Sequence, residues 1–364
     1  MRCSRNAFSF TLSALIAVLL CDAYLQLAEI QTPMETTIDP VLGPTFIPGR
    51  RIIRLNEGFF LGEVNDFGYM GPSVPPHRRG AERRILLLGD SFVLGHTVLP
   101  RHHFARRLEQ SLTEVVGETV HVLNFGKAGF DIRDMYVYFS SYVAGFDHDL
   151  ALFFVEENDL IPAGRLASEL YPVVRLAVDA PLIDTSFRES KKYRFYRAIE
   201  PVTTRSAVLR LAFNAYKMVQ RGELEGLLLG KFAQLADATP DAAGPPPAVS
   251  AGRAPVASLP PLSRAILCAL ARDPRNVLVI QNDLPSALRE EVLRVGLPVL
   301  ELSTELAALK TGGQDPYYWP VTKLRGHWNH ATHGEIARFL ERELVRKRLL
   351  WPCGRPPSSR SSYD

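Results

Sequence analysis

The sequence contains few cysteines, and none is placed as a metal or disulfide motif requires. Four are spread along 364 residues, without a closely spaced pair of the kind that holds zinc and without a dense framework of disulfides. This spacing favours free thiols. The four are Cys3, Cys21, Cys268 and Cys353.

An excess of charge of either sign is also absent. The 42 Lys and Arg and 39 Asp and Glu give a formal net charge of +3, and the arginines are scattered rather than clustered beside stacking aromatic residues. Because nucleic-acid binding requires clustered basic side chains, the sequence predicts no nucleic-acid partner. With 46% hydrophobic and 22% charged residues, the composition is that of a globular protein, which excludes disorder throughout.

The only long hydrophobic run is at the N-terminus. Arg2 and Arg5 precede an apolar stretch at residues 8–21, which continues more weakly to residue 28. A basic flank before about twenty apolar residues is typical of an export signal or a membrane anchor. Because no clear Ala-x-Ala cleavage site follows, we favour an uncleaved anchor at residues 1–28 with the rest of the chain on the extracytoplasmic side of the cytoplasmic membrane. Secretion after cleavage is the alternative.

From residue 84 onwards, short apolar runs alternate with amphipathic stretches. This alternation predicts an α/β domain with a mainly parallel sheet, over residues 81–347. Strands are predicted at residues 85–88, 120–123, 150–155, 277–280 and 299–302. Helices are predicted at residues 104–115, 133–142, 286–295 and 334–349.

The remaining segments do not follow this pattern. Residues 29–80 are rich in Pro, Gly and turn signals and are interpreted as a lead-in segment, with a short strand-like run at residues 52–55. A helical insertion or lid is expected at about residues 160–235. The Ala- and Pro-rich stretch at residues 237–261 is expected to be a flexible excursion, and residues 348–364 a disordered tail.

Polar blocks stand at the ends of the predicted strands, where open α/β sheets bind their ligands. Residues 89–92 follow the first strand and present Ser91, and residues 124–129 close the second. Residues 157–159 close the third strand, and residues 326–329 precede the last helix. Each block alone could be a turn, a helix cap or a surface histidine. Their order along the chain points to one shared site.

This order resembles the SGNH (GDSL-like) hydrolase superfamily, whose four blocks supply Ser, Gly, Asn and His in turn. The resemblance spans roughly residues 65–345 and is closest to exported members found with bacterial polysaccharide machinery, which often carry a segment like residues 65–71. It implies a three-layer α/β/α, flavodoxin-like fold with a mainly parallel sheet and a helical insertion. It implies no cofactor.

Roles for individual residues follow from the resemblance. Ser91 would be the nucleophile, and His327 would accept its proton and return it to the leaving group. The oxyanion would be held by the backbone N–H groups of Ser91 and Gly129 and by the side-chain amide of Asn158. Gly126 is the rival of Gly129 for this role.

The sequence departs from the family pattern beside two of these residues. Family members usually place an Asp two or three residues before the His, where this chain has Arg325 and Leu324. Asp315 is the candidate replacement, which would complete a triad, and a Ser-His dyad helped by a backbone carbonyl is the alternative. Asp90, Gly126, Asp315 and Arg325 are the candidate supporting residues. Glu156 stands where a Gly is common, two positions before the Asn.

A metal site is a second interpretation of the histidine-rich block. His327, His330 and His333 are spaced by three residues, but the first and last would diverge by about a third of a helical turn, and no carboxylate or Cys motif joins them. The sequence therefore predicts no metal.

Two functions remain open at this stage. The first is an envelope hydrolase or transferase that acts through an acyl-Ser91 intermediate on O-acyl, particularly O-acetyl, esters of a polysaccharide or glycoconjugate. Its partners would be the acylated carbohydrate and, through residues 1–28, the membrane. The second is a catalytically inactive SGNH-like protein that binds glycan or acts as a scaffold, which Arg325 and Glu156 motivate.

Overall fold

The computed structural model describes residues 2–28, 35–162, 170–220 and 258–350. The chain divides into two compact units, which are described separately. Residues 1–37 and 191–249 belong to the first, called here the helical unit. Residues 38–190 and 250–364 belong to the second, called the sheet unit.

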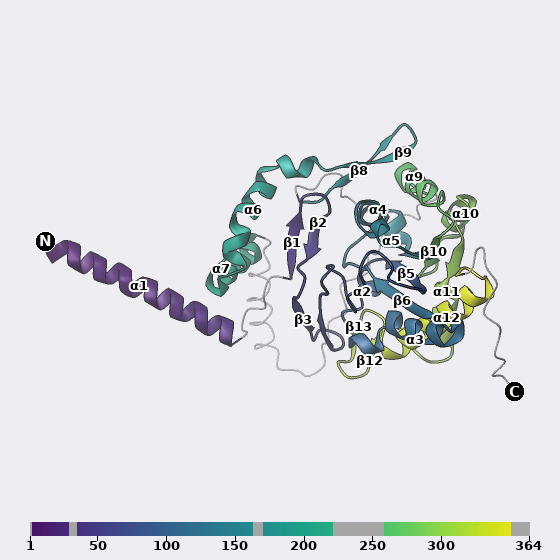
Figure 1. Ribbon diagram of the computed structural model, residues 1–364, viewed down its shortest axis with the longest axis horizontal. Helices are drawn as coiled ribbons and strands as arrows, with labels where there is room; N and C mark the ends of the chain where they lie inside the picture. Colours follow the sequence, from purple (N-terminus) through teal and green to yellow (C-terminus); the bar gives the residue numbers. More distant parts are fainter. Residues whose placement is uncertain (1, 29–34, 163–169, 221–257, 351–364) are drawn as a thin grey trace, which may run out of the picture. The chain divides into compact units, whose positions relative to one another are not determined.

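The sheet unit is built around a five-stranded parallel sheet (Figure 1) with the order β11-β10-β7-β5-β6. Counted along the chain, this is the flavodoxin-like order 2-1-3-4-5. The five predicted strands are confirmed, except that Leu302 begins a helix. The strands are β5 (Glu82–Leu88), β6 (Thr119–Asn124), β7 (Leu150–Val155), β10 (Asn276–Ile280) and β11 (Val299–Glu301).

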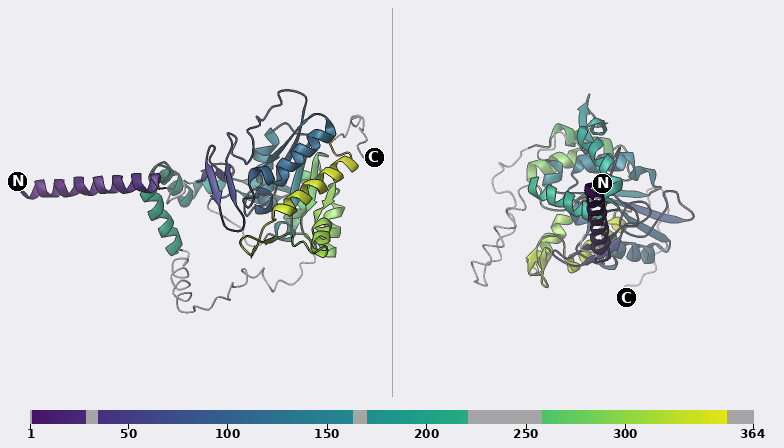
Figure 2. Two further views of the ribbon diagram at one scale, coloured as in Figure 1. Left: turned by 90° about the horizontal axis from the view of Figure 1, so that it is seen from below. Right: turned by 90° about the vertical axis from the view of Figure 1, so that its left-hand side faces the viewer.

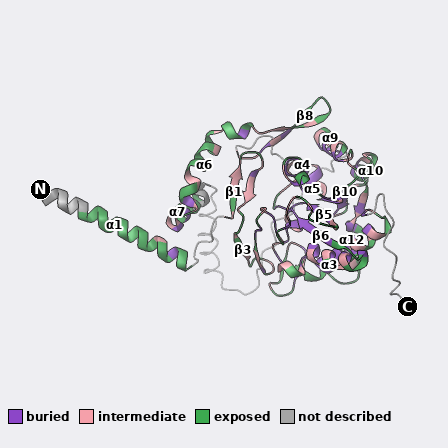
Figure 3. Ribbon diagram, in the orientation of Figure 1, coloured by how far each residue is buried: buried purple, intermediate pink, exposed green. Residues whose placement is uncertain are grey.

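The central strands are apolar on both faces because helices cover both sides of the sheet. Every residue of β7 and β10 is buried, and the strands appear as buried ribbon in Figure 3. One face packs on α4 (Ile132–Ser141), α9 (Pro261–Leu270) and α10 (Ser286–Arg294). The other packs on α3 (Phe104–Val116), α11 (Leu302–Thr311) and α12 (His330–Arg346). The three-layer α/β/α prediction is therefore confirmed.

The strand order has a switch point between β5 and β7. From β5 the chain crosses first to β6 on one side and then to β7 on the other, so the loops that leave β5 and β7 diverge. The carboxyl ends of the strands at such a point border the crevice where doubly wound folds bind ligands. Two of the four polar blocks follow these two strands. The short helices α2 (Ser91–Leu94) and α5 (Glu157–Leu160) begin there.

The lead-in segment is made of short strands. β1 (Thr36–Asp39) and β2 (Gly43–Phe46) form one two-stranded sheet, and β3 (Arg51–Arg54) and β4 (Phe60–Glu63) form an antiparallel hairpin. Met70 then bridges to Asn124 at the end of β6. A small buried cluster joins this hairpin to the short helix α2. Its members are Ile52, Phe60, Val64, Met70 and Leu94.

The described part of the predicted insertion becomes α-helical at residue 191. An antiparallel hairpin of β8 (Val173–Ala177) and β9 (Ala180–Asp184) comes first. Val178 and Asp179, both with positive φ, form its two-residue turn. The helices α6 (Lys191–Thr203) and α7 (Ala207–Gln220) follow and belong to the helical unit.

Two predicted flexible segments fall mainly outside the described residues. Of the expected excursion, residues 237–257 are not described, whereas Leu259 is buried and Pro261 begins α9. Of the expected tail, residues 351–364 are not described, whereas Leu350 is fully buried. The remaining short elements are the 3-10 turns Pro100–His102, Val143–Gly145 and Ser186–Glu189 and the hairpin of β12 (Tyr318–Trp319) and β13 (Leu324–Arg325).

The helical unit contains the long N-terminal helix α1 (Arg2–Leu27). Within it, Ser9–Leu27 is long and apolar enough to cross a membrane, judged by length and composition. Most of its described apolar side chains are exposed, including Leu15, Leu19 and Leu20. Such a helix is compatible with a signal anchor or a signal peptide.

Candidate active site

Ser91 is the first residue of α2, directly after β5. Asp90 caps this helix by accepting the Phe92 N–H at 2.9 Å. Gly89 permits the sharp turn from strand to helix, since a Cβ there would overlap the Val93 side chain and lie 3.1 Å from Phe154 Cβ. The hydroxyl is thereby presented at the carboxyl edge of the sheet, as the sequence predicts.

His327 lies in the loop before α12 and meets Ser91 there. Its Nε2 is 2.8 Å from Ser91 Oγ. Its ring packs against Phe92 with centroids 4.9 Å apart, and its carbonyl accepts the Trp319 Nε1–H at 3.0 Å. The first and last polar blocks, 236 residues apart, therefore form the hydrogen bond that a nucleophile and its base require.

The other side of the His327 ring is occupied by Glu57, which the sequence analysis did not identify. His327 Nδ1 is 3.0 Å from Glu57 Oε1 and 3.1 Å from Oε2. The His327 backbone N–H also donates to Oε2, at 2.5 Å. Glu57 lies in the turn between β3 and β4, in the lead-in segment. Gly326 makes the close approach possible, because a Cβ there would overlap the Glu57 carboxylate.

Asp315, the candidate replacement acid, has a different partner. Its Oδ2 forms an ion pair with Arg325 Nη2 at 2.5 Å, and its Oδ1 accepts the Tyr317 N–H at 3.1 Å. His327 therefore has an acid partner, although Arg325 stands where the family usually places one. Arg325 pairs with the expected substitute, and Glu57 takes the position beside the imidazole.

Glu57 and His327 alter each other's pKa. Burial lowers the pKa of His327, but the hydrogen bond and the charge of Glu57 outweigh burial and raise it above its usual value. Burial raises the pKa of Glu57, and the hydrogen bonds from His327 outweigh this and lower it. The pair therefore favours an ionised carboxylate beside an imidazole that gains a proton readily.

A hydrogen bond and close packing hold the block after β6 against the short helix α2. Asn124 Nδ2 donates to the Val93 carbonyl at 2.9 Å, and Asn124 Oδ1 accepts the Gly126 N–H at 3.0 Å. A Cβ on Gly126 would lie only 2.5 Å from the Leu94 nitrogen. Gly126 thus serves close packing, with its amide directed to Asn124. Gly129 is exposed, with the left-handed φ of 74° that favours glycine.

Asn158 is exposed on α5, beside Glu156. Asn158 Nδ2 donates to Glu156 Oε1 at 3.2 Å, while Asn282 Nδ2 donates to Glu156 Oε2 at 2.8 Å. The Tyr317 hydroxyl in turn donates to Asn282 Oδ1 at 2.8 Å. Two side-chain amides therefore hold the Glu156 carboxylate, and this carboxylate in turn orients the Asn158 side chain.

Two buried carboxyl groups lie beneath these residues. Burial, opposed by the Phe92 N–H and aided by the charge of Glu156, raises the pKa of Asp90 to about 6. Burial and the charge of Asp90 raise the pKa of Asp159 to about 9, so Asp159 is protonated at neutral pH. The charge of Asp90 also contributes to the raised pKa of His327.

The three histidines of the metal interpretation have separate environments. His327 contacts Ser91 and Glu57, whereas the exposed His330 ring packs against Trp319 at 5.7 Å. His333 is fully buried and accepts the Phe104 N–H at 3.2 Å. Within the described ranges, no group of three His, Cys, Asp or Glu residues could hold a metal ion.

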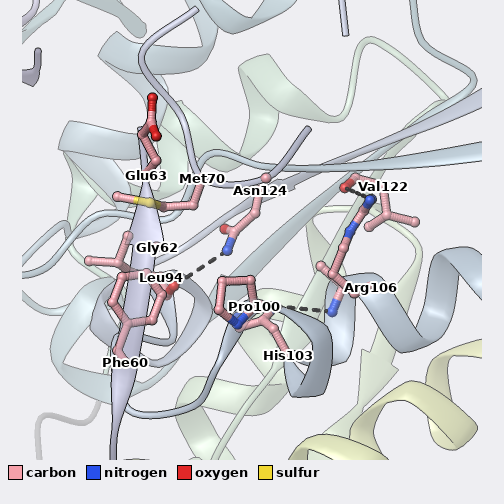
Figure 4. A pocket seen from close by; sticks show the side chains of 12 residues that line it. Phe60, Gly62, Glu63, Met70, Leu94, Pro100, His103, Arg106, Val122 and Asn124 are labelled. Atoms are coloured by element: carbon pink, nitrogen blue, oxygen red, sulfur yellow. Dashed lines mark hydrogen bonds between the residues drawn. The ribbon is translucent and has the colours of Figure 1, made fainter. Parts of the chain in front are cut away.

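A pocket lies behind α2 (Figure 4). It lies between β4, the end of α2, α3 and the edge strand β6, and neither Ser91, His327 nor Glu57 lines it. At its base His103 Nε2 is 3.0 Å from the Val93 carbonyl. Its lining residues are Phe60, Gly62, Glu63, Met70, Gly71, Leu94, Pro100, His103, Ala105, Arg106, Val122 and Asn124.

Comparisons with known proteins find similarity only among solved structures. No family model matches the sequence, and neither does any curated protein. A lipase/acylhydrolase from Enterococcus faecalis is 14% identical, with 76% of this chain and 100% of that chain covered and a TM-score of 0.35. A G-D-S-L family lipolytic protein from Veillonella parvula is 13% identical, with coverages of 73% and 100% and a TM-score of 0.32. A catalytic mutant of an acetylxylan esterase from Geobacillus stearothermophilus is 14% identical, with coverages of 72% and 94% and a TM-score of 0.35.

These identities and TM-scores say nothing about substrate or mechanism. The expected three-layer, flavodoxin-like fold is confirmed by the molecule itself, in its strand order and in the positions of the four blocks at one edge of the sheet.

Proposed function

We propose that this chain is an SGNH-type serine esterase or acyltransferase acting on O-acyl esters, O-acetyl in particular, of an envelope or extracellular polysaccharide. One observation carries the proposal. The His327 imidazole lies between Ser91 Oγ, 2.8 Å from Nε2, and the Glu57 carboxylate, 3.0 Å from Nδ1. A nucleophile, a base and an orienting acid in this arrangement form the triad that activates a serine hydroxyl.

The first half of the reaction forms an acyl enzyme. Ser91 Oγ attacks the ester carbonyl carbon while its proton passes to His327 Nε2, and Glu57 stabilises the imidazolium. The oxyanion is held by the backbone N–H groups of Ser91 and Gly129 and by the Asn158 amide. Collapse of the tetrahedral intermediate breaks the ester C–O bond, and the departing alcohol takes the proton from His327.

The second half depends on which molecule accepts the acyl group. His327 removes a proton from the acceptor as the acceptor oxygen attacks the acyl carbon, and Ser91 leaves with that proton. Water as acceptor gives an esterase, and a sugar hydroxyl gives a transferase. The carbohydrate substrate is inferred from the family resemblance, and the envelope location from α1 acting as an uncleaved anchor.

The inactive, glycan-binding alternative was motivated by Arg325 and Glu156. Arg325 pairs with Asp315, and Glu156 is held by the amides of Asn158 and Asn282. Neither residue interrupts the contacts between Ser91, His327 and Glu57. We therefore favour the enzyme, and the binding protein becomes the contrary outcome of the test.

The test is intact-mass labelling of the full chain in detergent with a fluorophosphonate, which reacts covalently with activated serines. We expect one adduct on the parent, and none on Ser91→Ala or on a well-folded His327→Ala. Ser140→Ala, which alters an exposed serine on α4, is the matched control and should label like the parent. A folded parent that takes up no label would support the binding protein instead.

A further inference from the structure

The helices α6 and α7 of the helical unit expose many apolar side chains. Phe195 is 54% exposed on α6, and Tyr216 and Val219 are each 58% exposed on α7. On α7 only Ala207 and Arg210 are buried among the residues whose burial is described. The exposed apolar residues of this surface, called here the α6–α7 face, are Phe195, Val202, Leu209, Leu211, Tyr216 and Val219.

This segment of the chain is also strongly basic. Residues 191–220 contain seven Lys or Arg and one acidic residue, Glu200, whereas the whole chain is nearly neutral. The basic residues are densest at the start of α6, where Lys191 and Lys192 are exposed. Apolar and aromatic side chains next to lysines and arginines form the pattern of a helix that lies at a membrane surface.

Hydrogen bonds attach the start of α7 to the end of α1. Asp22 Oδ1 accepts the Ser206 hydroxyl at 2.7 Å and the Val208 N–H at 2.9 Å, and Gln26 Nε2 donates to the Arg205 carbonyl at 3.0 Å. From this junction α7 runs across the axis of α1 rather than along it (Figure 2). If α1 crosses a bilayer, the junction marks the end of the span, and α7 extends along the bilayer surface.

We propose that the α6–α7 face docks on the bilayer surface around the anchor, with its apolar residues at the boundary between headgroups and acyl chains and its basic residues on anionic lipid. This proposal depends on α1 being a membrane anchor, as in the proposed function, but not on catalysis. Three observations carry it: the exposed apolar face, the local excess of basic residues, and the continuity of this face with the only described helix that is long and apolar enough to span. Tyr216 suits this zone, since the ring of tyrosine is amphipathic.

The docking would hold α6 and α7 against the membrane surface, whereas α1 alone would only tether the chain to the bilayer. Each Lys or Arg close to an anionic surface favours contact by about fivefold. The Lys191 and Lys192 pair should therefore make the contact strongly dependent on anionic lipid, while the apolar residues should maintain part of it on neutral lipid.

The test uses the full chain in vesicles of phosphatidylcholine brominated in its acyl chains, with or without phosphatidylglycerol. Bromine quenches tryptophan that enters the bilayer. Phe195→Trp and Tyr216→Trp report on the α6–α7 face. Val321→Trp, at a 92% exposed position of the sheet unit, is the matched control, and the parent gives the background of the native tryptophans. Flotation of the parent with the vesicles first establishes that α1 anchors the chain.

We expect quenching of the tryptophans added at positions 195 and 216, stronger with phosphatidylglycerol, and none of the one added at 321. In the Phe195→Trp background, Lys191→Glu with Lys192→Glu should remove the dependence on phosphatidylglycerol, whereas Lys310→Glu, an exposed lysine of the sheet unit, should not.

Two results would overturn the docking. A chain that floats but shows no quenching at positions 195 and 216 would have its α6–α7 face away from lipid, covered by a second copy or another protein. Equal quenching at position 321 would mean that the contact is not confined to this face. A chain that does not float would refute the anchor itself, and activity at Ser91 can be measured separately.

Discussion

Replacing Glu57 by Gln tests whether the lead-in segment supplies the third member of the triad. In the parent, the two oxygens of Glu57 accept from both His327 Nδ1 and the His327 backbone N–H. A Gln offers one oxygen and one NH₂ group. If the oxygen stays on the backbone N–H, the NH₂ group faces Nδ1 and forces the proton onto Nε2, which can then no longer accept the proton of Ser91.

The expected loss follows from this change of tautomer. In serine proteases the equivalent change from acid to amide lowers turnover about 10⁴-fold, or roughly 5 kcal/mol of transition-state stabilisation. We expect a loss of similar size in kcat/KM for 4-nitrophenyl acetate. Glu63→Gln, an exposed glutamate of the same hairpin, should stay near the parent value.

The pH profile supplies a second readout. His327 must be neutral to act as a base, so kcat/KM rises with pH through its pKa, which Glu57 holds above its usual value. Without the carboxylate, burial of the imidazole is no longer outweighed, and the acid limb of the residual activity should move to lower pH. Folding of each variant is checked by its melting temperature.

The reasoning would be refuted by a folded Glu57→Gln protein with parental kcat/KM and an unmoved acid limb. The same profile measured on Asp315→Asn completes the comparison. Because that carboxylate pairs with Arg325, its loss should leave the acid limb in place. A 10⁴-fold loss in Asp315→Asn instead would return the role of the acid to Asp315.

Two further substitutions probe the loops that surround the nucleophile. Gly126→Ala should lower the free energy of unfolding by about 1–3 kcal/mol, since the new methyl group would lie 2.5 Å from the Leu94 nitrogen, whereas Gly145→Ala meets no atom within 4 Å. Urea unfolding measures both, and an unchanged midpoint for Gly126→Ala would contradict the packing. Glu156→Ala should lower kcat more than it raises KM, by up to about a hundredfold, because the Asn158 amide loses the carboxylate that orients it. A faster enzyme would show that the charge of Glu156 opposes the oxyanion instead.

The core of the sheet could be predicted from sequence because strands covered on both faces appear as short apolar runs. Leu150–Val155 is such a run, and its predicted and observed limits coincide. Ser91 could be placed at the end of its strand by the same logic. The β8–β9 hairpin could not, since only Val174 is buried in its two strands, so that they form no continuous apolar run, and no Gly marks the turn.

Glu57 could not be predicted for a different reason. The absence of an acid before His327 leaves two possibilities, a Ser-His dyad or an acid from elsewhere, but the chain has 39 acidic residues, and nothing in the local sequence distinguishes Glu57. Only the folded lead-in hairpin brings Glu57 to an imidazole 270 positions further along the chain. Asp315 is the candidate that lies near His327 in sequence. Arg325 also lies near, and it pairs with the Asp315 carboxylate.

The separation of Glu57 from His327 also has a consequence for the order in which the protein becomes chemically competent. Synthesis delivers Glu57 first and Ser91 soon after, but His327 follows only 236 positions beyond Ser91. A nascent or prematurely terminated polypeptide therefore carries an ordinary, unreactive serine. On the proposed mechanism, Ser91 becomes reactive only when the loop that carries His327 closes on the hairpin that carries Glu57, so the synthesis of that loop times the onset of the chemistry.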